Sequence, residues 1–302
     1  MRTTVQFVLL ALTWGASFLF IKVGLDGLSP AQVVLGRLVT GAAALAVIAL
    51  VTRQRLPRSP AVWAHLAVVA VLLCVVPFLL FAWAEQHVDS GLASIYNATT
   101  PLMTMLVAAV ALPGERPTRL GLVGLAVGFA GVIVVLAPWQ GLAGGSLTAQ
   151  AACLLATFCY GLAFVYIRRF ISPLGLPAVA VTTVQVGIGA VLMLLAAPFV
   201  ATAPMHLTWA VVLSVTVLGV AGTGLAYVWN TNVVAGWGAT NASTVTYLTP
   251  IVGVGLGGVV LGELPSWNEP VGAVIVLLGM ALLQTRGRAP LVAASKTASV
   301  PR

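Results

Sequence analysis

Charged residues are scarce in this chain of 302 residues: they make up 7% of it, and only six are acidic. A soluble globular protein carries roughly a quarter charged residues, so this composition excludes one. Hydrophobic residues make up 60% of the chain, and its mean hydropathy is +1.09. We therefore expect the chain to be embedded in a lipid bilayer.

Cysteine and histidine are also few, with three of each. The cysteines lie in hydrophobic runs without metal-ligand spacing, and the histidines are scattered near the ends of such runs. These residues are Cys74, Cys153, Cys159, His65, His87 and His206. The hydrophobic runs also carry no paired aspartates and no Ser/His pair. We expect neither a metal nor a cofactor, and we do not expect an enzyme.

Long hydrophobic runs follow one another along almost the whole chain. A bilayer core needs roughly 20 apolar residues per helical span, whereas a transmembrane β-barrel would show short alternating segments. We predict an all-α membrane protein with ten transmembrane helices. The expected spans are residues 5–25, 30–51, 62–84, 90–111, 119–138, 147–168, 177–200, 207–230, 239–261 and 268–285.

The net charge of +8 is placed unevenly between these spans. Most arginines fall on one side if ten spans alternate, and basic loops face the cytoplasm. We expect both termini in the cytoplasm, a plasma (inner) membrane location, and no nucleic acid partner. The basic tail, residues 286–302, is expected to be disordered.

The sequence is internally repeated. TWGASFLFIK at 13–22 returns as CYGLAFVYIR at 159–168, Pro101 matches Pro250 at an offset of 149, and GERP at 114–117 matches GELP at 262–265. Two five-helix repeats are predicted, residues 1–140 and 141–285, and the second is inverted because five is odd. Inverted repeats are typical of secondary transporters, although a duplication need not imply transport.

Three stretches then resemble a known family: TWGASFLFIKVGLDGLSPAQVVLGR near the start, ASIYNATTPLMTMLVAAVALPGE in the fourth span and ASTVTYLTPIVGVGLGGVVLGE in the ninth. They are similar to EamA-type members of the drug/metabolite transporter superfamily. The resemblance implies a ten-helix bundle and, often, export of amino acids or related metabolites.

Arg37 is the leading candidate for substrate binding, because it lies seven residues after Pro30, roughly 10 Å into the second span. A guanidinium at that depth can hold a carboxylate with two hydrogen bonds. It can equally reach back to the interface or bind helix carbonyls. The matching position in the second half is Gln185.

Other cavity candidates are aromatic or polar residues in the repeated motifs and beside the paired prolines. They are Trp14, Ser17, Phe18, Trp83, Asn97, Thr100, Tyr160, Phe164, Thr246 and Tyr247. Ordinary packing is the alternative for each. Pro101 and Pro250 are expected to kink their spans and to serve gating.

Glu85, at the outer end of the third span, is the candidate coupling residue if burial raises its pKa, and otherwise a solvated helix end. Glu115 and Glu263 are interpreted as structural carboxylates at positive helix ends. The glycines at 124–128 and 253–262 are expected to form close-packing helix faces.

The function predicted from these features is export of small metabolites by alternating access. The expected substrates are amino acids or related carboxylate-bearing compounds, and the partners are a small molecule and the bilayer. Multidrug efflux of lipophilic cations is the alternative; it favours an intramembrane carboxylate, whereas this chain offers an arginine.

Overall fold

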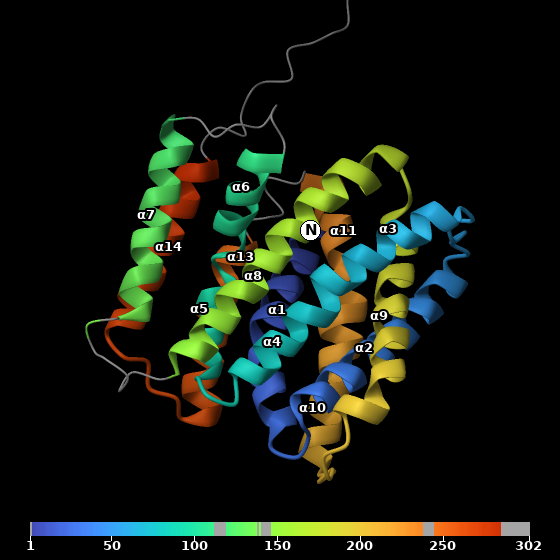
Figure 1. The fold of residues 1–302 in the computed structure, drawn as a ribbon, viewed down its shortest axis with the longest axis horizontal. Helices are drawn as coiled ribbons and strands as arrows, with labels where there is room; N and C mark the ends of the chain where they lie inside the picture. The colour runs from blue at the N-terminus through green and yellow to red at the C-terminus, as the bar shows by residue number, and fades with distance from the viewer. Residues whose placement is uncertain (1, 112–118, 138, 140–145, 238–244, 285–302) are drawn as a thin grey trace, which may run out of the picture.

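The protein is a bundle of helices in the computed structural model, which describes residues 2–111, 119–137, 139, 146–237 and 245–284. No strand occurs among these residues (Figure 1). The helices are α1 (Arg2–Leu25), α2 (Pro30–Val51), α3 (Pro60–Ala70), α4 (Val76–Ala84), α5 (Ser90–Asn97), α6 (Thr100–Ala111), α7 (Arg119–Leu136), α8 (Leu147–Tyr166), α9 (Ala178–Val200), α10 (Trp209–Gly219), α11 (Ala226–Trp237), α13 (Val245–Leu256) and α14 (Asn268–Gln284).

Eight helical segments of the described chain are long and apolar enough to cross a membrane. They end within a few residues of the first eight predicted spans, except that the sixth continues to Leu174. Two shorter apolar helices, Leu248–Leu261 and Asn268–Leu282, correspond to the last two predictions. Residues 239–244 and the tail at 286–302 lie outside the described residues. The all-helical membrane fold is therefore confirmed.

Local sequence explains where α2 starts. Before α2, the Ser29 hydroxyl accepts a hydrogen bond from the Gln32 backbone N–H, and the Gln32 side chain accepts one from the Ser29 backbone. This reciprocal cap satisfies two N–H groups that the helix leaves without partners. Pro30 occupies the first helical turn, where its missing N–H costs nothing.

Two spans change their helical winding near their middle. A π-helical segment η1 (Val71–Val75) joins α3 to α4, and η6 (Val220–Leu225) joins α10 to α11. Two further π-helical segments, η4 (Ile167–Ile171) and η7 (Gly257–Leu261), extend α8 and α13, and a 3₁₀ turn η5 (Ser172–Leu174) follows η4. Such segments widen a helix locally and often occur at functional sites.

The two proline-containing spans behave differently. The fourth span is divided at Ala98 and Thr99, just before Pro101, into α5 and α6. Pro250, in contrast, lies inside the continuous helix α13.

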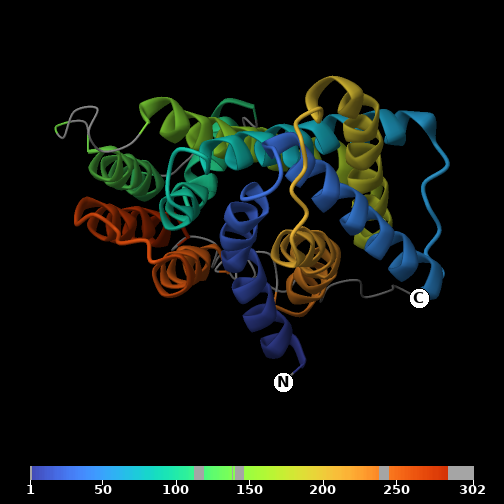
Figure 2. The same cartoon turned by 90° about the horizontal axis from the view of Figure 1, so that it is seen from below.

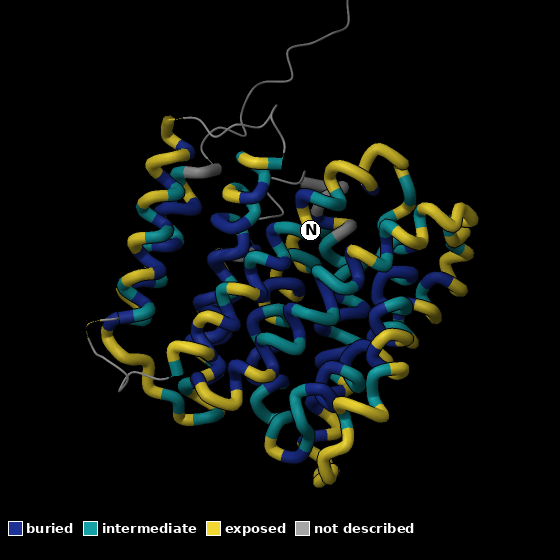
Figure 3. The backbone as a smooth tube through the Cα atoms, viewed as in Figure 1, coloured by how far each residue is buried: buried dark blue, intermediate teal, exposed yellow. Residues whose placement is uncertain are grey.

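The helices pack with α7 against α14 at one edge and α2 against α9 at the other (Figures 1 and 2). Between these pairs α1 contacts α10, α11 and α13, while α8 contacts α4 and α6. Figure 3 shows buried positions gathered on the inward faces of the helices and exposed ones on outer faces and turns.

Glycines allow α7 and α14 to approach backbone to backbone. A Cβ added at Gly279 would lie 2.5 Å from the Gly128 nitrogen and 2.7 Å from the Gly124 oxygen, and one at Gly131 would lie 2.6 Å from the Val276 nitrogen. Lipid supplies no hydrophobic driving force between helices, so close packing of small residues holds them together. The predicted packing face at 124–128 is confirmed.

We predict that Gly279→Leu destabilises the protein by about 1–3 kcal/mol, the usual cost of overpacking, because the neighbour it would meet is helix backbone. Thermal unfolding of the purified protein in neutral detergent measures the effect. Gly255→Ala on α13 is the control, since a Cβ there meets nothing within 4 Å. Equal melting temperatures for Gly279→Leu and the parent would contradict the packing argument.

Candidate functional site

Arg37 lies buried where α2 faces the π-helical segment η6. Its Nε donates a hydrogen bond to the Thr223 hydroxyl at 3.0 Å. Its guanidinium carbon stands 3.6 Å from the centre of the Phe78 ring, a cation–π contact. Arg37 is 8% exposed, and its Nε is satisfied by a side-chain hydroxyl rather than by a backbone carbonyl.

Gln185 makes a corresponding contact from α9. Its Nε2 donates to the Cys74 sulfur at 3.4 Å, and Cys74 belongs to the π-helical segment η1. In the sequence Thr223 follows Cys74 by 149 residues, the offset that also relates Pro101 to Pro250. Each long polar side chain therefore contacts a small polar side chain on a π-helical segment.

Aromatic side chains border this polar pair. The Phe18 and Phe81 rings meet edge to face at 5.5 Å, and Phe81 stacks on Tyr160 at 6.2 Å. Ser17 approaches η6, because a Cβ added at Gly222 would lie 3.1 Å from its hydroxyl oxygen. The Ser17 hydroxyl itself donates to the Thr13 carbonyl. Together with Arg37 and Gln185, these residues form what we call the central cluster: Ser17, Phe18, Arg37, Cys74, Phe78, Phe81, Tyr160, Gln185 and Thr223.

The other predicted cavity residues are less closely connected to this cluster. Trp83 and Phe164 are 39% and 45% exposed, so they lie on outer faces. Trp14 packs with Leu10, Ala226 and Val245 in a separate hydrophobic cluster. The side chains of Thr246 and Tyr247 lie outside the described residues.

Asn97 and Thr100 meet at the break in the fourth span. The Thr100 hydroxyl donates to the Asn97 carbonyl at 2.7 Å, which satisfies a carbonyl beside the interruption. Helices in lipid tolerate such breaks because side-chain hydroxyls form hydrogen bonds with the backbone groups that the break leaves free. A structural contribution of Thr100 is therefore visible at this position.

Glu85 is fully buried just beyond the end of α4, and neither carboxylate oxygen has a hydrogen-bond partner. Burial raises the pKa of this carboxyl well above its ordinary value; the Lys22 charge opposes that effect and the Glu263 charge adds to it. The Lys22 ammonium is held nearby by the backbone carbonyls of Glu85 and Val88, at 2.6 and 2.8 Å. Glu85 is thus not the solvated helix end that the sequence left open.

Glu263 joins the two halves of the chain at the same end of the bundle. Its carboxylate accepts hydrogen bonds from the Ser90 N–H, the Ser90 hydroxyl and the Gly91 N–H at 2.8–3.1 Å. It therefore caps the N-terminus of α5, a helix distant in sequence, where negative charge is favourable. Burial, and next the Glu263 charge, raise the pKa of neighbouring Asp89. The corresponding Glu115 lies outside the described residues.

Sequence reasoning missed Cys74, Phe78 and Thr223. Cys74 was interpreted as a residue of a hydrophobic run, and Thr223 was not proposed as a site residue because it lies in an apolar run. The signal that could have found both was their offset of 149, already visible at the paired prolines.

The chemistry available to the central cluster is noncovalent binding. It combines one fixed positive charge, amide and hydroxyl groups and aromatic surface, which is how small-molecule sites fix orientation within apolar walls. Among the described residues no group of three His, Cys, Asp or Glu side chains could hold a metal ion.

Comparisons with known proteins identify relatives of the chain and its fold. The chain is 31% identical over 289 residues to the "Probable terminal-alkyne amino-acid exporter" of Streptantibioticus cattleyicolor, covering 92% of both chains. It is 24% identical over 288 residues to the "Probable amino-acid metabolite efflux pump" of Salmonella typhimurium, covering 90% of this chain and 91% of that protein. A crystal structure that is 20% identical covers 93% of this chain and 96% of its own, with a TM-score of 0.66, which shows a shared fold.

The model of the EamA-like transporter family matches residues 2–137 and 147–285. These two segments contain every residue of the central cluster. The chain belongs to the EamA-like transporter family.

Proposed function

We propose that this membrane transporter exports small metabolites by alternating access, and that amino acids or related carboxylate-bearing compounds are its substrates. The observation that carries the proposal is the buried guanidinium of Arg37 in the central cluster. In the described part of the chain its partners are a neutral hydroxyl and an aromatic face, and no carboxylate is hydrogen-bonded to it. A substrate carboxylate would supply the missing negative charge.

The helix contacts support two inverted five-helix repeats, residues 1–140 and 141–285. Exchanging the halves turns the α1–α13 contact into the α8–α6 contact, and the α1–α11 contact into the α8–α4 contact. The α2–α9 and α7–α14 contacts map onto themselves. The π-helical segments η1 and η6 begin 149 residues apart. Two halves related in this way can exchange the inner and outer positions around one site.

The difference between the halves would orient a bound substrate. Arg37 contacts Thr223, whereas the corresponding Gln185 contacts Cys74. The charge therefore belongs to the first half and the neutral amide to the second. A zwitterionic substrate placed between them would direct its carboxylate toward Arg37 and its apolar side chain toward Phe18, Phe81 and Tyr160.

Glu85 is the group that we assign to proton coupling. It is buried without a hydrogen-bond partner, close to the Lys22 and Glu263 charges. Burial without hydrogen bonds favours the neutral form of a carboxyl over the ionised form, and we assign the protonated acid to this conformation. Opening of the outer side would hydrate the group and release the proton.

Membrane placement completes the proposal. Arg53, Arg55, Arg58, Arg119, Arg168 and Arg169 occupy the ends of the helices opposite Lys22 and Glu85 in an alternating bundle. Positive loops face the cytoplasm, so both termini are placed there, in the plasma (inner) membrane, with Glu85 toward the outside. Pro101 and Pro250 would then flank the moving parts of the fourth and ninth spans.

Efflux of lipophilic cations has one observation in its favour. Glu85 is a buried carboxylate one turn after Phe81, a combination that suits a cation. Flux of lipophilic cations without flux of amino acids, in proteoliposomes offered both, would replace amino-acid export by this second function.

Arg37→Gln should lower kcat/KM for carboxylate-bearing substrates about 10- to 100-fold, because a charge-assisted hydrogen bond contributes about 1.5–3 kcal/mol. Counterflow in proteoliposomes with a labelled panel of neutral amino acids, acidic amino acids and other carboxylates measures this. Arg119→Gln, at an exposed arginine on α7, is the control. Parental rates in a folded and inserted Arg37→Gln protein would remove Arg37 from the site.

Substrate should slow alkylation of Cys74 several-fold, because Cys74 lies in the central cluster between Gln185 and Arg37. The measurement uses N-ethylmaleimide on the Cys153→Ser, Cys159→Ser protein, with transported and untransported amino acids compared. The matching protein that retains only Cys153, buried in a different hydrophobic cluster, should show no protection. Unchanged Cys74 labelling at saturating substrate would place binding elsewhere.

Glu85→Gln should abolish accumulation driven by a proton gradient and leave counterflow intact. The folded state raises the Glu85 pKa, so the parent loses stability as pH rises above the ordinary value of about 4.3. The variant should show a shallower decline, because Asp89, whose pKa is also raised, remains. Transport with and without a gradient, together with melting at several pH values, tests both effects. The control is Asp26→Asn, at an exposed outer carboxylate. If the Glu85→Gln protein still accumulates substrate when a proton gradient is present, Glu85 is not the coupling residue.

A further inference from the structure

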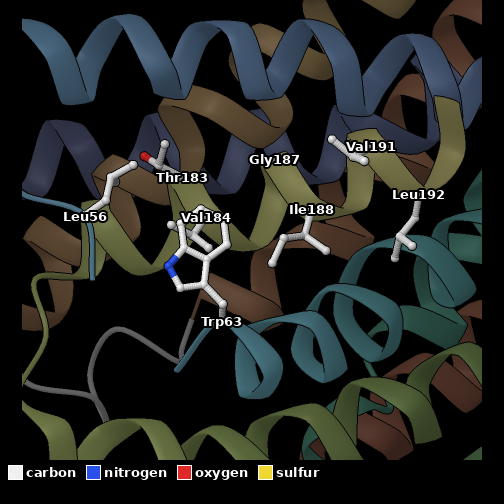
Figure 4. Close-up of a pocket in the computed structure, with 8 residues that line it drawn as sticks. All are labelled: Leu56, Trp63, Thr183, Val184, Gly187, Ile188, Val191 and Leu192. Carbon is white, nitrogen blue, oxygen red and sulfur yellow. The ribbon is translucent and has the colours of Figure 1, made fainter. Parts of the chain in front are cut away.

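An apolar groove of about 300 Å³ lies on the flank of the bundle, between α9 and the chain that leads into α3. Figure 4 shows Leu56 and Trp63 beside α9, with Val191 and Leu192 farther along that helix. The lining residues are Leu56, Trp63, Thr183, Val184, Gly187, Ile188, Val191 and Leu192. None of them belongs to the central cluster, so the groove is a separate site.

The groove suits a hydrocarbon chain. Its lining is aliphatic and aromatic except for Thr183, whose hydroxyl is already used by the Val179 carbonyl at 2.7 Å. Gly187 leaves its floor open, because a Cβ added there would meet nothing within 4 Å. From Thr183 to Leu192 the groove follows α9 for roughly 13 Å at 1.5 Å per residue, the length of part of an acyl chain.

Three arginines surround the residue that closes one end of the groove. Arg53, Arg55 and Arg58 are exposed, and Leu56, a lining residue, lies between them in the chain. The loop is fastened to α3 because the Trp63 indole N–H donates to the Pro57 carbonyl at 2.8 Å. The loop that contributes Leu56 to the groove therefore carries three exposed positive charges.

Arg53 is held in a strained backbone conformation, with a φ of 52°. It ends α2 in a Schellman motif: the Arg53 N–H donates to the Leu50 carbonyl and the Gln54 N–H to the Ala49 carbonyl. Glycine adopts this left-handed conformation without steric cost, whereas a residue with a Cβ does not. Backbone strain of this kind motivates a functional hypothesis for the Arg53 side chain.

We propose that this groove binds an anionic phospholipid, with one acyl chain along α9 and the phosphate held by Arg53, Arg55 and Arg58. Charge complementarity selects the headgroup, since arginine forms paired hydrogen bonds with phosphate. Each basic side chain near an anionic membrane surface adds its own contribution to the binding free energy. The lipid contacts α9 on the side of Val184, next to Gln185 of the central cluster, so its occupancy stabilises the α2–α9 side of the bundle.

The test uses the full-length protein, delipidated in neutral detergent, and native mass spectrometry with phosphatidylglycerol or phosphatidylcholine of identical acyl chains. We expect preferential binding of phosphatidylglycerol and a larger rise in melting temperature with it. Removing the charges in Arg53→Gly, Arg55→Gln, Arg58→Gln should weaken phosphatidylglycerol binding by about fivefold per arginine. Arg119→Gln, away from the groove, should leave it unchanged.

A second variant separates the groove from the charges. Gly187→Leu fills open space, so the protein should fold and lose bound phosphatidylglycerol while keeping all three arginines. Arg53→Gly alone should melt no lower than the parent in lipid-free detergent, since it removes backbone strain. The proposal is overturned if Gly187→Leu binds the lipid normally, if Arg119→Gln weakens binding as much as the groove variants, or if the mass spectra show a dimer that Gly187→Leu abolishes.

Discussion

Hydrocarbon cannot hydrogen-bond to a peptide group, and the rest of this structure depends on that constraint. Every backbone N–H and C=O in the bilayer must find a partner within the protein, so the described spans are helical except for the turn at Ala98 and Thr99. Irregular backbone within a membrane span is tolerated only where protein surrounds it. The π-helical segments η1 and η6 occur at such places, and they carry Cys74 and Thr223, the partners of Gln185 and Arg37.

Hydropathy was sufficient to predict the helices but not their irregularities. The spans that begin at Pro30 and Ser90 start where they were expected, because a proline or serine after a polar loop is a recognisable helix start. Nothing in an apolar run such as VLLCV or VAGTGL distinguishes π-helical from α-helical winding. The pairing of Arg37 with η6 could not be predicted, since it depends on how helices 186 residues apart are packed.

Five predicted cavity residues lie in the central cluster, although their role in binding stays a prediction: Ser17, Phe18, Arg37, Tyr160 and Gln185. The outward placement of Trp83 and Phe164 was not predictable, because an aromatic residue in a lipid-facing position has the same local sequence as one in a cavity. Glu85 was placed at a span end, where solvation is common, but the folded chain covers it completely. Glu263 was expected to complement a helix end, and it does so on α5 rather than on the helix that follows it.

The contact of Glu263 with α5 has a mechanical consequence. The eight-residue helix α5 is fastened at its N-terminus to the second half of the chain and is separated from α6 by the break at Ala98 and Thr99. Both parts of this span contact the second half of the chain, since α5 packs against α13 and α8 and α6 packs against α8. The Glu263 carboxylate ties the start of the fourth span to the second half through three hydrogen bonds, so α5 and the loop that carries Glu263 must move together.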